Sequence, residues 1–305
     1  MGEEFAQLQL NFNEDNLFAL NIAIAVIMFG VALDIDREKF SEAIKNPRGI
    51  FTGVSSQFIL LPLLTFLLIY LIKPIPELAL GMILVAACPG GNVSNFYTAV
   101  SKGNIALSIS LTAIATLAAV FMTPFNFTFW SELYLKEGHD LAIQLDFFKM
   151  FKTVILILGI PLLLGLWFSK QFKKATSLIA KPLRILSFLI LISIIILAFS
   201  KNTEIFKQYY HYVIYIVFIH NAIALSLGFY WGKLMKLSLQ DCKTISIETG
   251  IQNSGLALVI IFTMFDGNGG MALVAAWWGI WHIISGFVIA LIFSRGSLLT
   301  FAYSK

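Results

Sequence analysis

Residues 244–264 read TISIETGIQNSGLALVIIFTM, an apolar stretch of membrane-spanning length with one carboxylate, Glu248, inside it. We predict that every other carboxylate of the chain lies in a loop or a tail. An ionised carboxylate at mid-bilayer costs at least about 2.5–3.5 kcal/mol, so Glu248 needs a partner. Amide and hydroxyl side chains surround it, and Gly250 and Gly255 loosen the helix. The stretch therefore predicts a cation site on a broken helix.

The composition indicates an all-α polytopic membrane protein. Mean hydropathy is +0.85 and only 12% of the 305 residues are charged, about half the fraction of a soluble domain. Apolar runs of about 20 residues recur without alternation, which favours helices over a β-barrel. Two cysteines, Cys88 and Cys242, are too few for a disulfide framework. Basic residues do not cluster with aromatics in a soluble segment, which argues against nucleic acid as a partner.

We predict nine transmembrane helices. They lie at about Leu17–Leu33, Gly49–Ile72, Leu78–Val100, Asn104–Thr123, Thr153–Phe168, Leu183–Phe199, Tyr212–Trp231, Thr244–Met264 and Met271–Phe293. Fifteen of the 21 Lys and Arg residues then fall on one side, which we assign as cytoplasmic. The N-terminus is expected outside and the C-terminus inside, in a plasma or inner membrane.

A second interruption lies in the third span, where residues 87–95 read ACPGGNVSN. Pro89 removes a backbone donor and the following glycines favour unwinding. The third and eighth spans cross the membrane in opposite directions, and such a pair in inverted halves indicates a transporter. We divide the chain into an outer tail (1–16), a first repeat of four helices broken at 88–95 (17–123), an outer loop (124–152), a second repeat of five helices broken at 248–255 (153–293) and a cytoplasmic tail (294–305).

At these motifs the chain resembles the bile acid:sodium symporter family. The resemblance rests on ACPGGNVSN at 87–95, GNIALS at 103–108 with Thr112, and ETGIQNSGLA at 248–257, and it extends from Leu17 to the end. It implies the nine-helix form of the family, like the liver bile-salt carriers. The implied fold has a core domain, in which two broken helices cross, and a smaller panel domain.

The resemblance also implies two sodium ions. The first site maps onto Ser94, Asn95, Ser108, Thr112 and Glu248, and the second onto Gln57, Glu248, Gln252 and the carbonyls of Thr249 and Ile251. The residues agree with this, because the i,i+4 pair Ser108 and Thr112 puts two hydroxyls on one helical face and hard cations take oxygen ligands. Taken alone, a side chain such as Ser108 or Gln57 more often forms a hydrogen bond within or between helices than binds a cation.

Substrate contacts are expected at Asn92, Asn253 and His282, polar residues near mid-depth. A lone membrane histidine equally suits a helix–helix hydrogen bond, the interpretation we keep for His220. Asn92 stands where relatives often carry threonine, which leaves the identity of the substrate open.

We therefore expect a sodium-coupled symporter of an organic anion (a bile acid, a steroid conjugate or a small carboxylate) that works by alternating access. No nucleotide-binding loop and no protein partner is indicated, and the lipid bilayer is the expected surrounding. A sodium-independent carrier, a channel and an intramembrane enzyme remain alternatives. The enzyme lacks supporting motifs, so we expect no catalytic residues.

Overall fold

The chain folds into helices almost throughout. The computed structural model describes residues 14–33, 46–91, 93–136, 146–201 and 203–303. Between residues of these ranges one isolated bridge is formed, Gly90 with Gln252, and no sheet is described. The all-α prediction is confirmed to this extent. In chain order the helices are α2 (Glu14–Leu33), α4 (Pro47–Ser55), η1 (Ser56–Leu60), α5 (Leu61–Ile72), α6 (Pro76–Ala87), α7 (Val93–Val100), α8 (Ile105–Leu135), α9 (Phe147–Val154), η2 (Ile155–Gly159), α10 (Ile160–Gln171), α11 (Lys173–Lys201), α12 (Thr203–Leu234), α13 (Leu239–Gly250), α14 (Ser254–Met264) and α15 (Gly269–Tyr303).

Five of the described helical segments are long and apolar enough to cross a membrane: Pro47–Ile72, Ile105–Leu135, Phe147–Gln171, Tyr210–Leu234 and Gly269–Arg295. Shorter apolar helices cover Ile22–Leu33, Pro76–Ala87 and Ser254–Met264. The chain is an integral membrane protein by this measure, and the count of nine spans stays a prediction.

Two long segments contain a π-helical turn that ends two residues before a proline. The turn Ser56–Leu60 precedes Pro62, and the turn Ile155–Gly159 precedes Pro161. A proline ring clashes with the carbonyl four residues earlier and offers no N–H, so a wider turn at this place relieves the clash and lets the helix continue.

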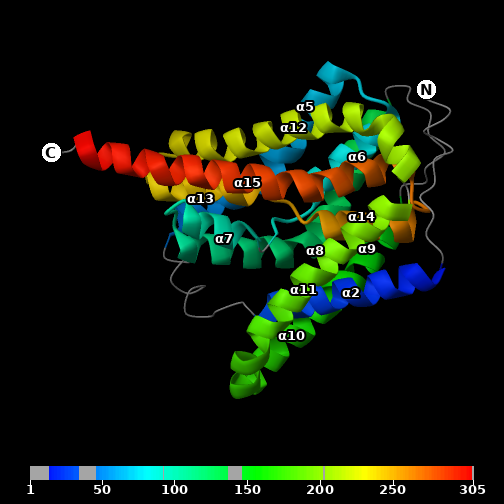
Figure 1. The fold of residues 1–305 in the computed structure, drawn as a ribbon, viewed down its shortest axis with the longest axis horizontal. Helices are drawn as coiled ribbons and strands as arrows, with labels where there is room; N and C mark the ends of the chain where they lie inside the picture. Colours follow the sequence, from blue (N-terminus) through cyan, green and yellow to red (C-terminus); the bar gives the residue numbers. More distant parts are fainter. Residues whose placement is uncertain (1–13, 34–45, 92, 137–145, 202, 304–305) are drawn as a thin grey trace.

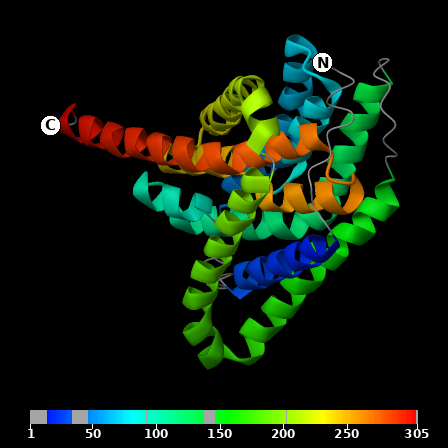
Figure 2. The same cartoon turned by 45° about the vertical axis from the view of Figure 1, so that its right-hand side comes forward.

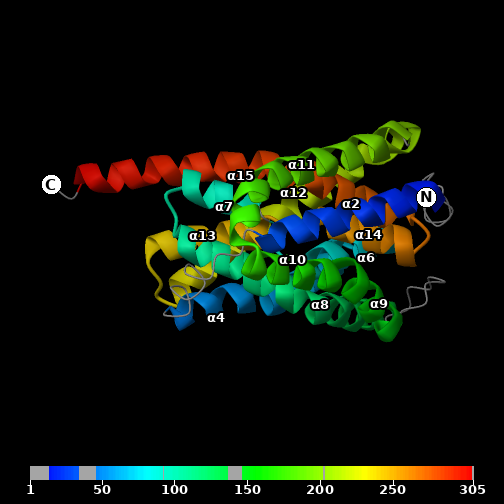
Figure 3. The same cartoon turned by 90° about the horizontal axis from the view of Figure 1, so that it is seen from below.

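The two interrupted helices run antiparallel through the middle of the molecule. In Figures 1 and 3, α6 leads into α7 in one direction while α13 leads into α14 in the other. Helix α12 lies directly against α13, because a Cβ at Gly228 would come within 2.5 Å of the Ile245 carbonyl oxygen. Helix α2 packs against α10 and α11, and Figure 2 shows this blue and green group beside the rest. The close packing of α12 fixes the position of α13 and hence of Glu248.

The segment 124–152 differs from the predicted outer loop. Helix α8 continues through Pro124 to Leu135, and α9 begins at Phe147. With 31 residues α8 is about 46 Å long, more than the hydrocarbon thickness, so it extends beyond a bilayer core. Proline is tolerated inside membrane helices where neighbouring groups satisfy the freed backbone. The turn signal of Pro124 therefore placed the helix end too early.

The placement of every other carboxylate in a loop or tail was wrong for several residues. Exposed Glu132 lies in α8, and two further exceptions are Glu77 and Asp241. Both are buried, with 2% and 8% of their surface exposed, and both lie in the first turn of a helix. A helix N-terminus stabilises a carboxylate through its free N–H groups and its dipole, which hydropathy alone does not reveal. The tail 1–16 falls largely outside the described residues, so its prediction is not tested.

Candidate functional site

The two helix breaks meet and satisfy each other. Helix α6 ends at Ala87 and α7 begins at Val93, while α13 ends at Gly250 and α14 begins at Ser254. The Gly91 N–H donates to the Ile251 carbonyl, and the Asn253 N–H donates to the Pro89 carbonyl, both over 2.9 Å. In a membrane such unwound backbone must find partners within the protein. The crossing segments do this for one another.

Gly90 is needed at this crossing. A Cβ at position 90 would lie 3.1 Å from the Glu248 carbonyl oxygen and 3.3 Å from its carboxylate oxygen Oε2. Contacts that short are tighter than ordinary van der Waals contact. The absence of a side chain at Gly90 therefore lets the first break approach the carboxylate on α13.

Three hydroxyls converge on the buried Glu248 carboxylate, which is 5% exposed. Ser94 of α7 donates to Oε1 over 2.6 Å, and Thr112 of α8 donates to Oε2 over 3.0 Å. Ser108 of α8 also contacts Oε1. Ser108 is joined in turn to Asn95 Oδ1 at 2.8 Å and to Thr98 Oγ1 at 3.2 Å. We call Ser94, Asn95, Thr98, Ser108, Thr112 and Glu248 together the hydroxyl cluster.

The hydroxyl cluster has more acceptor oxygens than hydroxyl hydrogens. Ser108 carries one hydrogen, yet three oxygens lie within its hydrogen-bonding distance. A hydroxyl can rotate, so a group that donates to Glu248 can instead turn a lone pair towards a cation. Among the described residues no three His, Cys, Asp or Glu side chains gather as a metal site. The donor set, one carboxylate with neutral oxygens, fits a hard monovalent cation.

A pair of amides lies across the same crossing. Gln57 Nε2 donates to Gln252 Oε1 at 3.1 Å, and Gln252 Nε2 donates back to Gln57 Oε1 at 3.0 Å. We call these two side chains the amide pair. The Gln57 amide also donates to the Cys88 carbonyl at 2.8 Å, and the Gln252 amide to the Thr249 carbonyl at 2.7 Å.

The amide pair therefore connects both breaks to helix η1, which contains Gln57. Each amide oxygen has two lone pairs and uses one of them in the pair. The Thr249 carbonyl accepts from Gln252, and the Ile251 carbonyl accepts from Gly91, so each of these also keeps one lone pair. Of the residues predicted for the second sodium site, Gln57, Gln252 and the Thr249 carbonyl are therefore joined by hydrogen bonds, and Glu248 lies with the hydroxyl cluster.

The predicted substrate residues have separate surroundings. Asn92 lies outside the described residues. The Asn253 side chain caps α14 by accepting from the Leu256 N–H at 3.0 Å. His282 of α15 is buried, and its Nδ1 has no hydrogen-bond partner in the described part of the chain. One turn further along α15, a Cβ at Gly286 would meet Ile251 and Tyr97. His282 is thus on a helix that packs against the crossing, without a described bond to the hydroxyl cluster or the amide pair.

His220 forms the helix–helix hydrogen bond predicted for it. Its Nε2 lies 2.7 Å from Thr65 Oγ1, and its ring packs edge-on against Trp278. Thr65 Oγ1 also donates to the Leu61 carbonyl over 2.8 Å, within its own helix.

Thr98 and Asn221 are among the side chains at the crossing that the sequence did not indicate. Thr98 bonds Ser108, and it lies four residues after Ser94 on the same face of α7, a spacing that could have revealed it. Asn221 of α12 donates to the Gly250 carbonyl at 2.8 Å and so caps the broken end of α13. No signal in the sequence joins Asn221 to Gly250.

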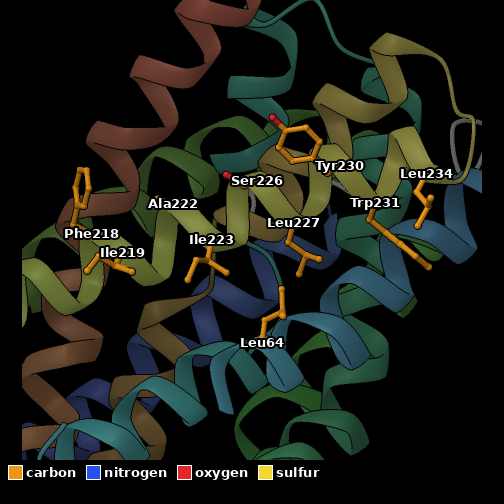
Figure 4. Close-up of a pocket in the computed structure, with 10 residues that line it drawn as sticks. All are labelled: Leu64, Phe218, Ile219, Ala222, Ile223, Ser226, Leu227, Tyr230, Trp231 and Leu234. Atoms are coloured by element: carbon orange, nitrogen blue, oxygen red, sulfur yellow. The ribbon is translucent and has the colours of Figure 1, made fainter. Parts of the chain in front are cut away.

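An apolar groove lies elsewhere, between α5 and α12 (Figure 4). It has a volume of about 560 Å³. Its lining residues are Leu64, Phe218, Ile219, Ala222, Ile223, Ser226, Leu227, Tyr230, Trp231 and Leu234. None of them is charged, and none belongs to the hydroxyl cluster or the amide pair. The groove is therefore separate from the candidate cation ligands.

Comparison with known proteins gives matches along most of the chain. A family model described as the Sodium Bile acid symporter family matches residues 21–209. The uncharacterized sodium-dependent transporter YocS of Bacillus subtilis is 33% identical over 291 residues, which cover 94% of this chain and 88% of that protein.

Two mammalian proteins are similar at lower identity. The sodium-dependent organic anion transporter of Bos taurus is 27% identical over 274 residues, covering 87% of this chain and 70% of that protein. The ileal sodium/bile acid cotransporter of Homo sapiens is 27% identical over 249 residues, covering 81% of this chain and 69% of that protein. These relatives are named as transporters and none of the three as an enzyme.

Proposed function

The chain belongs to the sodium bile acid symporter family, and we propose from this that it carries an organic anion across the membrane together with two sodium ions. Sodium-dependent transport is the function common to the family. The number of ions, the substrate and the residues that bind them are our proposal.

The observation that carries the proposal is the set of three hydroxyls on the Glu248 carboxylate. We assign the first sodium ion to Glu248 with Ser94, Asn95, Ser108 and Thr112. In the absence of sodium the hydroxyls satisfy the buried carboxylate, and with sodium they turn their oxygens to the ion. The same carboxylate therefore has a partner in either state.

We assign the second sodium ion to the amide pair side of the crossing. Its ligands are Gln57, Gln252, the carbonyls of Thr249 and Ile251, and again Glu248. The hydrogen bonds of Gln57 and Gln252 already reach the Cys88 and Thr249 carbonyls. An ion held there stiffens both breaks at once, and substrate then binds to a fixed crossing.

The anion is proposed to bind next to Asn92, Asn253 and His282. Helix α14 begins at Ser254, so its N-terminus directs a partial positive charge to this side of the crossing. The two sodium ions add positive charge close by. The helix N-terminus and the sodium ions then attract the anion in place of an arginine or lysine. The anion is a bile acid, a steroid conjugate or a small carboxylate.

In the proposed cycle the interrupted helices and their neighbours form a core that moves against a panel built on α2, α10 and α11. Two sodium ions moving with one monovalent anion transfer one net positive charge. Each such charge gains about 2.3 kcal/mol per 100 mV of membrane potential, so uptake is electrogenic.

Uptake into proteoliposomes tests this function. We expect saturable uptake of a bile salt or another organic anion that needs an inward sodium gradient and responds to membrane voltage. Equal uptake with choline in place of sodium would indicate a sodium-independent carrier. Discrete single-channel currents would indicate a pore, and a chemically altered product would indicate an enzyme.

A further inference from the structure

The three helices that supply the hydroxyl cluster are tied together again at the end of the bundle where α13 begins, on the left in Figures 1 and 3. There α7 has just ended at Val100, α8 starts at Ile105 and α13 starts at Leu239. The residues of this second contact are not part of any proposed sodium or substrate site. All are polar; Asp241, Lys243 and Thr244 are buried, and Asn46 and Asn104 are half-buried, so their arrangement requires an explanation.

The centre of the contact is the carboxylate of Asp241, 8% exposed. Its Oδ1 accepts from Asn104 Nδ2 at 2.8 Å, and its Oδ2 accepts from Asn46 Nδ2 at 3.5 Å. Both asparagines are N-caps: Asn104 Oδ1 accepts from the Leu107 N–H and Asn46 Oδ1 from the Gly49 N–H. Asp241 therefore accepts hydrogen bonds from the side-chain amides of two N-cap residues, those of α8 and α4. Asp241 itself lies in the first turn of α13.

Neighbouring residues of α13 strengthen the same contact. Thr244 Oγ1 accepts from the Asn104 N–H at 2.8 Å. The Lys243 ammonium, 4% exposed, donates to the Ser101 carbonyl at 3.3 Å and to the Phe293 carbonyl at 2.8 Å. The carboxylate lies at helix N-termini, where the helix dipole favours an anion, and the ammonium donates to two carbonyl oxygens.

The spacing links this contact to the sodium ligands. Asp241 and Glu248 are seven residues apart on α13, about two turns, and Asn104 and Ser108 are four residues apart at the start of α8, so each pair shares one helical face. The Asp241–Asn104 bond and the Glu248–Ser108 contact therefore join the same faces of α13 and α8. The first bond restricts rotation and sliding of the two helices where the second must form.

We propose that Asp241 is a positioning residue for sodium: through Asn104 it holds α8 and α13 in the register that places Ser108 and Thr112 on Glu248. Asp241 itself lies about 10 Å of helix rise from Glu248 and does not touch the ion. The proposal rests on the proposed sodium site of the hydroxyl cluster. It predicts that sodium affinity depends on a hydrogen bond outside the site.

A donor–acceptor exchange tests it. In Asp241→Asn the new NH2 group faces the NH2 group of Asn104 or of Asn46. Both groups are donors, so one of the two hydrogen bonds is lost. In Asn104→Asp two carboxylates face each other. In the double variant the amide introduced on α13 donates to the carboxylate introduced on α8 and accepts from Asn46, while that carboxylate still caps α8. The measurement is the sodium concentration that gives half of the sodium-induced thermal shift of the purified protein.

We expect each single variant to need about ten-fold more sodium than wild type, and the double variant to return to within about three-fold, a clear departure from additivity. Substrate half-saturation at saturating sodium should stay unchanged. Asp146→Asn is the matched control, since it makes the same substitution at the exposed N-cap of α9, where the carboxylate accepts from the Lys149 N–H. It should leave the sodium titration unaltered.

Two results separate failure of the inference from failure of the proposed function. A sodium response in wild type that is lost in Glu248→Ala, combined with an unchanged sodium titration in Asp241→Asn, overturns the positioning role alone. Single variants that only lower the melting temperature in choline, without moving the sodium titration, overturn it as well. A wild-type protein that does not respond to sodium overturns both.

Discussion

The hydroxyl cluster and the amide pair lie on the same helix crossing but are built from different chemistry. The hydroxyl cluster consists of rotatable hydroxyls around one carboxylate, with contacts mainly between side chains. The amide pair consists of two planar groups that bond each other and also the backbone of both breaks, at Cys88 and Thr249. The hydroxyl cluster is arranged so that its hydroxyls can exchange hydrogen-bond partners. The amide pair is arranged to fix the backbone of the two breaks.

This difference suggests a division of labour within the proposed symporter. A cation at the hydroxyl cluster competes with hydroxyl hydrogens that reorient at little cost. A cation at the amide pair acts on the unwound segments 88–91 and 251–253, next to which the substrate is proposed to bind. The first group is then expected to set sodium affinity, and the second to couple sodium to substrate. The predictions below test this division, starting with the residue shared by both.

Glu248→Ala should have the largest effect and abolish sodium-dependent uptake. It removes the one carboxylate of the hydroxyl cluster, and no water replaces it in a buried site. The measurement is initial uptake against sodium concentration in proteoliposomes, with the amount of protein in the membrane measured in parallel. Glu132→Ala, which removes an exposed carboxylate of α8, is the control and should transport as wild type. Normal transport by Glu248→Ala would rule out both sodium sites.

The features that mark the two helix breaks are each local in the sequence. Pro89 with Gly90–Gly91, and Gly250 beside a carboxylate in an apolar stretch, mark helix breaks because proline and glycine act on the backbone locally. Ser108 and Thr112 share a face through helical spacing alone. That this face meets Glu248, 140 and 136 residues away, was implied by the family resemblance and not by the spacing.

Other features depend on tertiary packing and were not readable. Gln57 and Gln252 are 195 residues apart, so residue order alone, without the family resemblance, does not predict that they bond each other. The burial of Glu77 and Asp241 follows from helix starts that hydropathy places in loops. The passage of α8 through Pro124 likewise depends on neighbours that satisfy the backbone.

Gln57→Ala and Gln252→Ala should come next, weakening sodium coupling and substrate binding together. Each change removes one half of the amide pair and leaves a buried carbonyl, Cys88 or Thr249, without its donor, which costs about 1–3 kcal/mol. We expect the half-saturating concentrations of both sodium and substrate to rise by about ten-fold or more. Uptake titrated with each ligand at fixed levels of the other gives both values.

Gln240→Ala is the control for the amide variants, because Gln240 lies on α13 and is exposed. If both amide variants keep the wild-type sodium curve, the second sodium ion is removed from the proposal. If they shift sodium without shifting substrate, the division between the two groups fails, although the second ion remains.

Ser108→Ala should have a smaller effect, confined to sodium. It deletes one neutral oxygen of several, worth about 1–2 kcal/mol, or about ten-fold in sodium affinity. Maximal uptake at high sodium should stay close to wild type, as should substrate half-saturation. A parallel rise in substrate half-saturation would show that the hydroxyl cluster also couples the two ligands.

Thr98→Val should give the smallest effect, because Thr98 touches the hydroxyl cluster only through Ser108, at 3.2 Å. Its hydroxyl is an alternative partner for the single hydrogen of Ser108, and without it that hydrogen stays on Glu248 or Asn95. Sodium must then displace a more firmly held hydrogen bond, so we expect a two- to three-fold rise in half-saturating sodium, within about 0.7 kcal/mol.

Thr116→Val is the matched control, since Thr116 is also buried, one turn beyond Thr112, and bonds its own helix at the Thr112 carbonyl. The comparison needs sodium titrations of both valine variants in one membrane preparation. A shift in Thr98→Val as large as that of Ser108→Ala would make Thr98 a direct ligand, and a shift shared by Thr116→Val would trace the effect to packing of buried hydroxyls.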